Sequence, residues 1–178
     1  MDALEAIYSR RSIRKFKPDV PEIRLVEEIL EAGARAPSGG NCQPWRFIVI
    51  TDKKTINLVT LFSPGFANHP TKPPLLLAVC STQEGYGEGQ TPRMKAMLDT
   101  YLAAENIAIA AVAKGLGTVM VSSFPEKEIK EILEVPENVD LALLIALGYP
   151  DIDGNSRATI RKPVESVSYK EKFGKPWG

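Results

Sequence analysis

The sequence predicts a single domain that combines helices with four buried strands. Its 178 residues, 44% hydrophobic and 25% charged, have the size and composition of one globular domain with a real core. Apolar residues recur at helical spacing between shorter and nearly continuous apolar runs, so helices are expected between the strands. The strands are predicted at 47–50, 75–81, 118–122 and 141–147.

Two helices are predicted before the first strand. The first begins at Asp2, which forms a capping-box pattern with Glu5. Its apolar face comprises Leu4, Ile7 and Tyr8. The second begins near Pro21, a residue suited to the first turn of a helix, and cannot continue past Pro37. Its apolar stripe comprises Leu25, Val26, Ile29, Leu30 and Gly33.

A glycine-rich loop leads from the second helix into the first strand, between Pro37 and Pro44. Because Gly39 and Gly40 lack a Cβ, a flat ligand can lie directly against the backbone. Further polar and aromatic groups of this stretch are Asn41, Gln43 and Trp45. The alternative is an ordinary tight turn that Trp45 anchors in the core.

The next elements are predicted from caps and breakers. Asp52 can cap a helix after the first strand, and a further helix begins near Pro125 and ends before Pro136. Irregular segments are expected at 65–74 and 82–92. The second of these holds three glycines and is expected to be flexible.

The longest helical pattern runs from Arg93 to Lys114, and its apolar residues spread around most of the circumference. Such a helix must be covered on several sides, which indicates a partner subunit. The alternative is a central core helix within one subunit. The polar tail at about 151–178 contains Tyr169, Phe173 and Trp177, so it is expected to pack on its own surface or on a partner.

The stretch from Arg10 to Phe16 is rich in arginine and lysine. If its backbone is extended, Ser12 and Arg14 point to the same side and form a fork for an anion. Arginine meets a phosphate monoester with a planar pair of donors, and serine adds a hydroxyl. The alternative is a solvated basic edge without a ligand.

Composition excludes several classes of partner. Lysine and arginine number 22, as do aspartate and glutamate, so no net charge attracts nucleic acid or anionic lipid. The sequence shows no secretion signal and no stretch expected to span a bilayer, which predicts a cytoplasmic protein. Cys42 and Cys80 lack metal-ligand spacing, and His69 is the single histidine, so neither a metal site nor a Ser-His-Asp triad is expected.

Together, these motifs resemble the flavin-dependent nitroreductase family over nearly the whole chain. Residues 10–16 are similar to its Arg-Arg-Ser-x-Arg-x-Phe pattern, and residues 37–47 to its Pro-Ser-x-x-Asn-x-Gln-Pro-Trp-x-Phe signature. The glycines after the long helix, the Gly148-Tyr149-Pro150 turn and the pair Arg161-Lys162 follow in the family's order.

The resemblance implies an α+β fold, a mainly antiparallel sheet in a three-layer α-β-α arrangement, and a homodimer with FMN at each of two interface sites. Implied contacts to the phosphate or ribityl chain come from Arg10, Ser12 and Arg14, with Arg11 nearby and Arg161 and Lys162 on the C-terminal side. Implied contacts to the ring come from Pro37, Ser38, Gly39 and Asn41 of the partner, with Gln43 in the same loop, and from Asn68. Backbone N–H groups near Ser122 and Ser123 are the candidates for a hydrogen bond to flavin N5.

The implied activity is ping-pong hydride transfer from NADH or NADPH, through flavin N5, to a nitroaromatic, quinone or related acceptor. No catalytic side chain is required, because the flavin carries the chemistry. Two rivals stay open: a flavin store or sensor without turnover, and a specialised flavin enzyme of the dehalogenating or flavin-fragmenting type. A third, an anion-binding surface without flavin, predicts a colourless protein.

Overall fold

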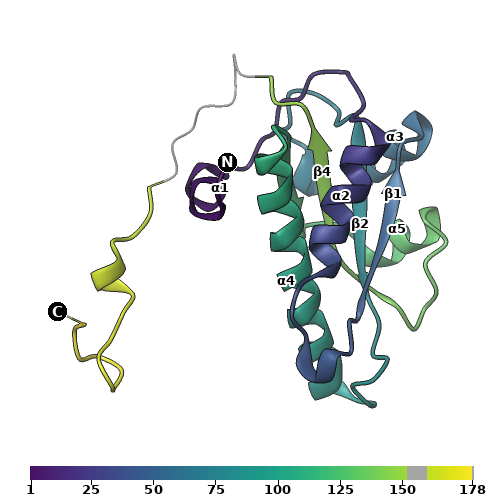
Figure 1. The fold of residues 1–178 in the computed structure, drawn as a ribbon. Helices are drawn as coiled ribbons and strands as arrows, with labels where there is room; N and C mark the ends of the chain where they lie inside the picture. Colours follow the sequence, from purple (N-terminus) through teal and green to yellow (C-terminus); the bar gives the residue numbers. More distant parts are fainter. Residues whose placement is uncertain (152–159, 178) are drawn as a thin grey trace.

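Four antiparallel strands form one sheet in the order β1-β2-β4-β3. The computed structural model describes residues 1–151 and 160–177 (Figure 1). The strands are β1 (Trp45–Ile50), β2 (Leu75–Ser81), β3 (Gly117–Val121) and β4 (Asp140–Gly148). β2 and β4 are buried along their whole length, while β1 and β3 form the two edges. The predicted antiparallel sheet is confirmed.

Helices cover both faces of this sheet, which confirms the three-layer α-β-α fold (Figure 1). On one face, α2 (Ile23–Ala34) and α4 (Gln90–Ala113) lie side by side. Their buried side chains, such as Ile29 and Ile107, pack on alternate residues of the central strands. On the other face, α3 (Lys53–Phe62) and α5 (Glu126–Ile132) complete a second core.

Several predicted boundaries shift by two or three residues. α4 begins at Gln90 instead of Arg93, because Pro92 is tolerated in the first turn of a helix, so the predicted loop at 82–92 is shorter. Pro21 precedes Glu22, the N-cap of α2, so its predicted place in the first turn is wrong. β1 begins at Trp45, which pairs with Ser81, and the third strand occupies 117–121.

α4 has two apolar faces with different environments. Its inner face lies against the sheet and is fully buried at Ala103, Ala104 and Ile107. Its outer face carries large exposed apolar side chains: Met94, Leu98, Tyr101 and Leu102. By length and composition α4 is also apolar enough to cross a bilayer, contrary to the expectation from sequence. Its packing against α2 and all four strands is that of a core helix.

Two peripheral segments also expose apolar side chains. The short helix α1 (Ala3–Ser9) buries only Ala6, whereas Leu4, Ile7 and Tyr8 are exposed. The C-terminal segment 160–177 lies apart from the sheet and is folded on itself, with the Tyr169 and Phe173 rings 4.5 Å apart (Figure 1). Of the predicted tail, residues 152–159 and 178 lie outside the described residues.

Candidate functional site

The basic N-terminal segment lies along the β3 edge of the sheet. Ser12 forms an isolated parallel bridge with Thr118, and the Ile13 N–H donates to the Thr118 carbonyl at 2.8 Å. Gly117 makes this close approach possible, because an added Cβ would lie only 2.6 Å from Ile13 Cγ1. Ser12 and the neighbouring Arg14 are exposed on this edge, as a phosphate fork requires.

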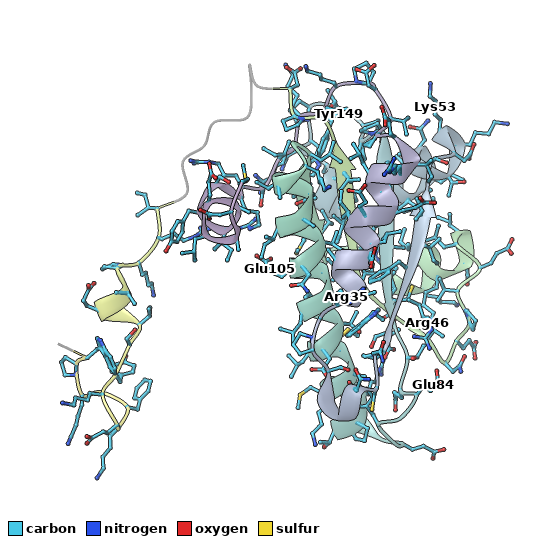
Figure 2. The ribbon with its side chains drawn as sticks, in the orientation of Figure 1. Arg35, Arg46, Lys53, Glu84, Glu105 and Tyr149 are labelled. Carbon is cyan, nitrogen blue, oxygen red and sulfur yellow. The ribbon has the colours of Figure 1, made fainter. Side chains whose placement is uncertain are left out.

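Two other cations of this segment have carboxylate partners. Arg10 Nε lies 3.5 Å from Glu105 Oε1 of α4, and Lys15 Nζ lies 2.8 Å from Asp151 Oδ2. Figure 2 shows Glu105 on the side of α4 that faces α1. Arg11 is exposed. The acidic partners therefore hold the ends of the segment on the body of the domain, on either side of Ser12 and Arg14.

The loop that carries Asn68 is hydrogen-bonded both to the N-terminal segment and to the residues just after β3. The Gly65 N–H donates to the Ser123 carbonyl at 3.1 Å, and the Phe16 N–H donates to Thr71 Oγ1 at 2.9 Å. Asn68 and the pair Ser122-Ser123 are exposed. The structure thus brings the predicted N-terminal, ring-end and N5 segments to one edge of the sheet.

His69, which the sequence singled out only as the single histidine, lies in the same loop. Burial and then the positive charge of Arg14 lower the pKa of His69. Its Nδ1 atom is buried without a hydrogen-bond partner among the described residues. The side chain lines a 400 Å³ pocket together with Thr60, Phe66 and Lys72. His69 is therefore a neutral, polar neighbour of the predicted fork.

The glycine loop from Pro37 to Gln43 lies at the opposite edge, before β1. Gly40, Asn41 and Gln43 have φ values of +58°, +57° and +50°, so the loop holds three left-handed residues. Ser38 Oγ accepts from the Gln43 N–H at 2.9 Å, and Asp99 Oδ2 of α4 accepts from the Gly39 N–H at 2.7 Å. Neither Asp99 nor this bond was predicted from the sequence.

Arg161 and Lys162 are exposed and belong to the C-terminal segment that Figure 1 shows apart from the sheet. Within one chain, the predicted site residues are therefore distributed over three places. The β3 edge holds half of them, the β1 edge holds the glycine loop, and the C-terminal segment holds the last two cations.

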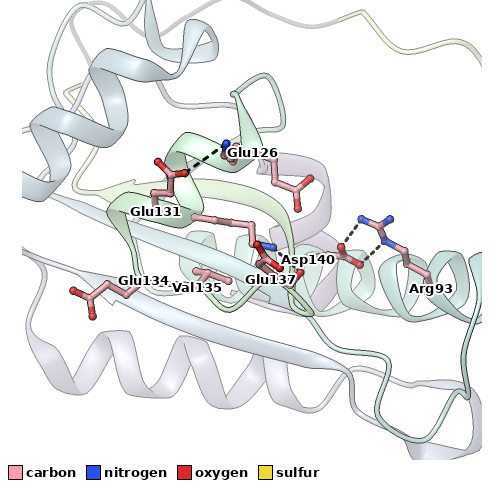
Figure 3. Close-up of a pocket in the computed structure, with 9 residues that line it drawn as sticks. Arg93, Glu126, Glu131, Glu134, Val135, Glu137 and Asp140 are labelled. Carbon is pink, nitrogen blue, oxygen red and sulfur yellow. Dashed lines mark hydrogen bonds and ion pairs between the residues drawn. The ribbon is translucent and has the colours of Figure 1, made fainter.

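A pocket of about 650 Å³ contains none of the predicted site residues (Figure 3). It lies between α5 and the start of β4, and its lining is mostly charged. Arg93 forms a two-pronged ion pair with Asp140, at 2.8 and 2.5 Å, and Lys130 Nζ donates to the Glu137 carbonyl at 3.0 Å. Arg93 and Asp140 therefore satisfy each other, and Lys130 is bound to the backbone, so volume alone does not make this hollow the site.

The fold and the two edges define a three-layer α+β sandwich with a basic segment on one side of its sheet and a glycine loop on the other. The family model for the nitroreductase family matches residues 7–72 and 65–149. The chain belongs to the nitroreductase family, a family of oxidoreductases.

Relatives and solved structures agree with this assignment. A protein of Archaeoglobus fulgidus, named as a candidate NADH dehydrogenase/NAD(P)H nitroreductase, is 33% identical over 155 residues, 84% of this chain and 86% of its own. A nitroreductase family protein of Clostridium difficile superposes with a TM-score of 0.83 at 25% identity, over 97% of this chain and 99% of its own. The NADPH:FMN oxidoreductase of Vibrio harveyi, solved with NAD+, shares the fold with a TM-score of 0.85 at 23% identity, over 97% of this chain and 78% of its own.

Proposed function

We propose that this protein is a cytoplasmic FMN-dependent NAD(P)H oxidoreductase that acts as a homodimer and reduces nitroaromatic, quinone or related small-molecule acceptors. The observation that carries the proposal is the separation of the two site segments. Residues 10–14 lie on the β3 edge, whereas the loop Pro37–Gln43 leads into the opposite edge strand, β1.

Within one subunit these two segments are not neighbours. β2 and β4 lie between the two edge strands, which places β1 and β3 about 14 Å apart at ~4.8 Å per strand. Helices cover both faces of the sheet between them. A second copy that presents its loop to the first copy's β3 edge resolves the separation, and two-fold symmetry then creates two identical sites.

The exposed apolar surface supports a second subunit. Met94, Leu98 and Tyr101 line a 450 Å³ hollow along the outer face of α4. α1 exposes Leu4 and Tyr8 nearby, since α1 contacts α4. Clustered apolar side chains of this size are typical of a subunit interface.

The residues of the β3 edge fit FMN by the chemistry of their donors. Ser12 and Arg14 are exposed on a segment that β3 holds in place, so a hydroxyl and a guanidinium are both accessible to a phosphate at this edge. Arg10 holds the segment to α4 through Glu105, and Arg161 and Lys162 can approach the phosphate from the C-terminal side. The exposed Asn68 and the peptide groups near Ser122 and Ser123 are left for the ring.

When bound, FMN supplies two-electron redox chemistry between a nicotinamide and an acceptor, and the protein supplies binding and orientation. The partner's loop, with Pro37, Ser38, Gly39, Asn41 and Gln43, supports the edge of the ring. The name of the Vibrio harveyi structure, which includes both FMN and a nicotinamide, supports this assignment of cofactor and donor.

The test begins with the colour and mass of the purified full-length chain. We expect absorbance near ~450 nm from bound FMN, twice the subunit mass by light scattering, and bleaching by NADH or NADPH. A screen of nitroaromatics, quinones and free flavin then identifies the acceptor. A coloured protein that NAD(P)H does not bleach would be a store or sensor, and a colourless monomer that takes up no FMN would overturn the proposal.

Replacing Arg14 by alanine is expected to weaken FMN binding by about 1.5–3 kcal/mol, roughly 10- to 150-fold, because one charge-assisted phosphate contact is lost. Fluorescence titration of the cofactor-free protein measures the change. Arg14→Lys keeps the charge but loses the planar pair of donors. Its FMN affinity is therefore expected to lie between those of the unmodified protein and Arg14→Ala. Lys53→Ala, which removes an exposed cation from the start of α3, serves as the control. Equal affinity in Arg14→Ala and Lys53→Ala would remove Arg14 from the site.

A further inference from the structure

Two donors from different loops meet on one oxygen of Asp99. The Gly39 N–H donates to Asp99 Oδ2 at 2.7 Å, and the Tyr86 hydroxyl donates to the same atom at 2.5 Å. Asp99 belongs to the rigid helix α4, Gly39 to the glycine loop, and Tyr86 to the segment between β2 and α4. We name these three groups the Asp99 latch.

The glycine loop needs such external support because its backbone is strained. Asn41 and Gln43 have positive φ values, which non-glycine residues adopt rarely unless surrounding contacts impose them. The loop's internal bonds, from the Asn41 and Gln43 N–H groups to Ser38, hold its ends to each other. The bond from Gly39 to Asp99 attaches the loop to the helix.

The segment that carries Tyr86 also contacts the glycine loop and the residues that lead from it into β1. The Thr82 N–H donates to the Pro44 carbonyl at 2.9 Å. Gly85 has a φ of +80°, and an added Cβ there would lie 2.8 Å from Cys42 Sγ. A salt bridge of 2.8 Å joins Arg46 to Glu84 at the exposed rim, where Figure 2 labels both residues. The two loops therefore form one packed unit.

The chemistry of Tyr86 suits a permanent donor. Burial, and then the hydrogen bond to the Asp99 carboxylate, raise the pKa of Tyr86. The hydroxyl thus stays protonated and keeps donating at any physiological pH. The side of Gly39 that lacks a side chain also faces the latch, because an added Cβ would lie 3.6 Å from Asp99 Oδ2 and 3.7 Å from Tyr86 Cε1.

We propose that Asp99 is a positioning residue: its carboxylate, closed by Tyr86, fixes the glycine loop in the conformation that supports the flavin of the neighbouring subunit. The inference rests on the proposed function. Asp99 touches neither cofactor nor substrate in this role. It acts through the Gly39 peptide, and it lowers the cost of ordering the loop when FMN binds.

The experiment compares Asp99→Leu and Tyr86→Phe with the unmodified protein in two states. In the cofactor-free state, hydrogen–deuterium exchange of the peptide containing Gly39–Cys42 is expected to accelerate at least tenfold in Asp99→Leu and less in Tyr86→Phe. In the FMN-loaded state, Asp99→Leu is expected to release FMN about tenfold faster and to shift the visible flavin spectrum. Asp99→Asn can still place one oxygen between both donors, so it is expected to restore most of each property.

Glu84→Gln is the matched control, because it weakens a charged contact between the Tyr86 segment and β1 at the exposed rim, where ion pairs contribute little. It is expected to change neither exchange nor FMN release. If Asp99→Leu exchanges and releases FMN like Glu84→Gln, the positioning role is wrong while the proposed function stands. If the unmodified protein takes up no FMN, the proposed function fails, and the exchange experiment alone still decides whether Asp99 orders the loop.

Discussion

Replacing Leu98 by aspartate is expected to produce folded single subunits that retain no FMN. Leu98 is 59% exposed on the outer face of α4, so the change costs an isolated subunit little. In a two-fold dimer the new carboxylate occurs twice in the apolar contact, and each buried, unpaired charge costs several kcal/mol. A penalty of about 4 kcal/mol would weaken dimerisation roughly 1000-fold. Light scattering and flavin absorbance of the purified variant measure both outcomes.

Leu61→Asp provides the comparison for this prediction. Leu61 is 73% exposed and lies on α3, which covers the opposite face of the sheet. Leu61→Asp makes the same chemical change on an exposed position of α3. In the proposed dimer, α3 lies outside the subunit contact. We expect a yellow dimer. A dimeric, FMN-loaded Leu98→Asp protein would show that α4 is not the subunit contact, and loss of the dimer in both variants would show that the effect is not specific to α4.

Local signals made most of the fold predictable. The Asp2 side chain accepts from the Glu5 N–H at 2.8 Å, and the Asp52 side chain accepts from the Thr55 N–H at 2.8 Å, so both predicted caps are confirmed. Such bonds join residues three apart, and their residue types identify them in the sequence. The central strands were recognisable because burial on both faces leaves a continuous apolar run, as in β2.

The site was less predictable because its contacts join distant residues. Gly39 and Asp99 lie 60 positions apart, and no periodicity or cap connects them. Arg10 and Glu105 are also far apart in the sequence. The sequence therefore showed a row of cations but did not show which of these cations form ion pairs with carboxylates. The segment before α4 was predicted only as a flexible loop with three glycines, and the structure shows that Gly85, Gly87 and Gly89 all adopt positive φ values. Their role in seating Tyr86 depends on the tertiary fold.

The second large expected effect, on FMN affinity, follows from the way β3 holds Ser12 and Arg14 in place. Gly117 leaves room for Ile13, and a Cβ at this position would lie 2.6, 2.8 and 3.0 Å from three atoms of the Ile13 side chain. In Gly117→Val, Ile13 must therefore move outward, and the bridge between Ser12 and Thr118 is expected to open. Ser12 and Arg14 then leave the edge together.

Because two phosphate contacts are lost at once, Gly117→Val is expected to weaken FMN binding about 100-fold or more, a larger effect than that of Arg14→Ala. The overpacking itself should lower the free energy of unfolding by about 1–3 kcal/mol, which leaves the subunit folded. Fluorescence titration and thermal unfolding of the cofactor-free protein measure the two effects separately. Thr118→Val places the same side chain on the next residue of β3 without approaching Ile13, so its FMN affinity is expected to stay close to that of the unmodified protein. A Gly117→Val protein with reduced stability but unchanged FMN affinity would show that the cofactor does not depend on the position of residues 12–14, and the β3 edge would lose its proposed role.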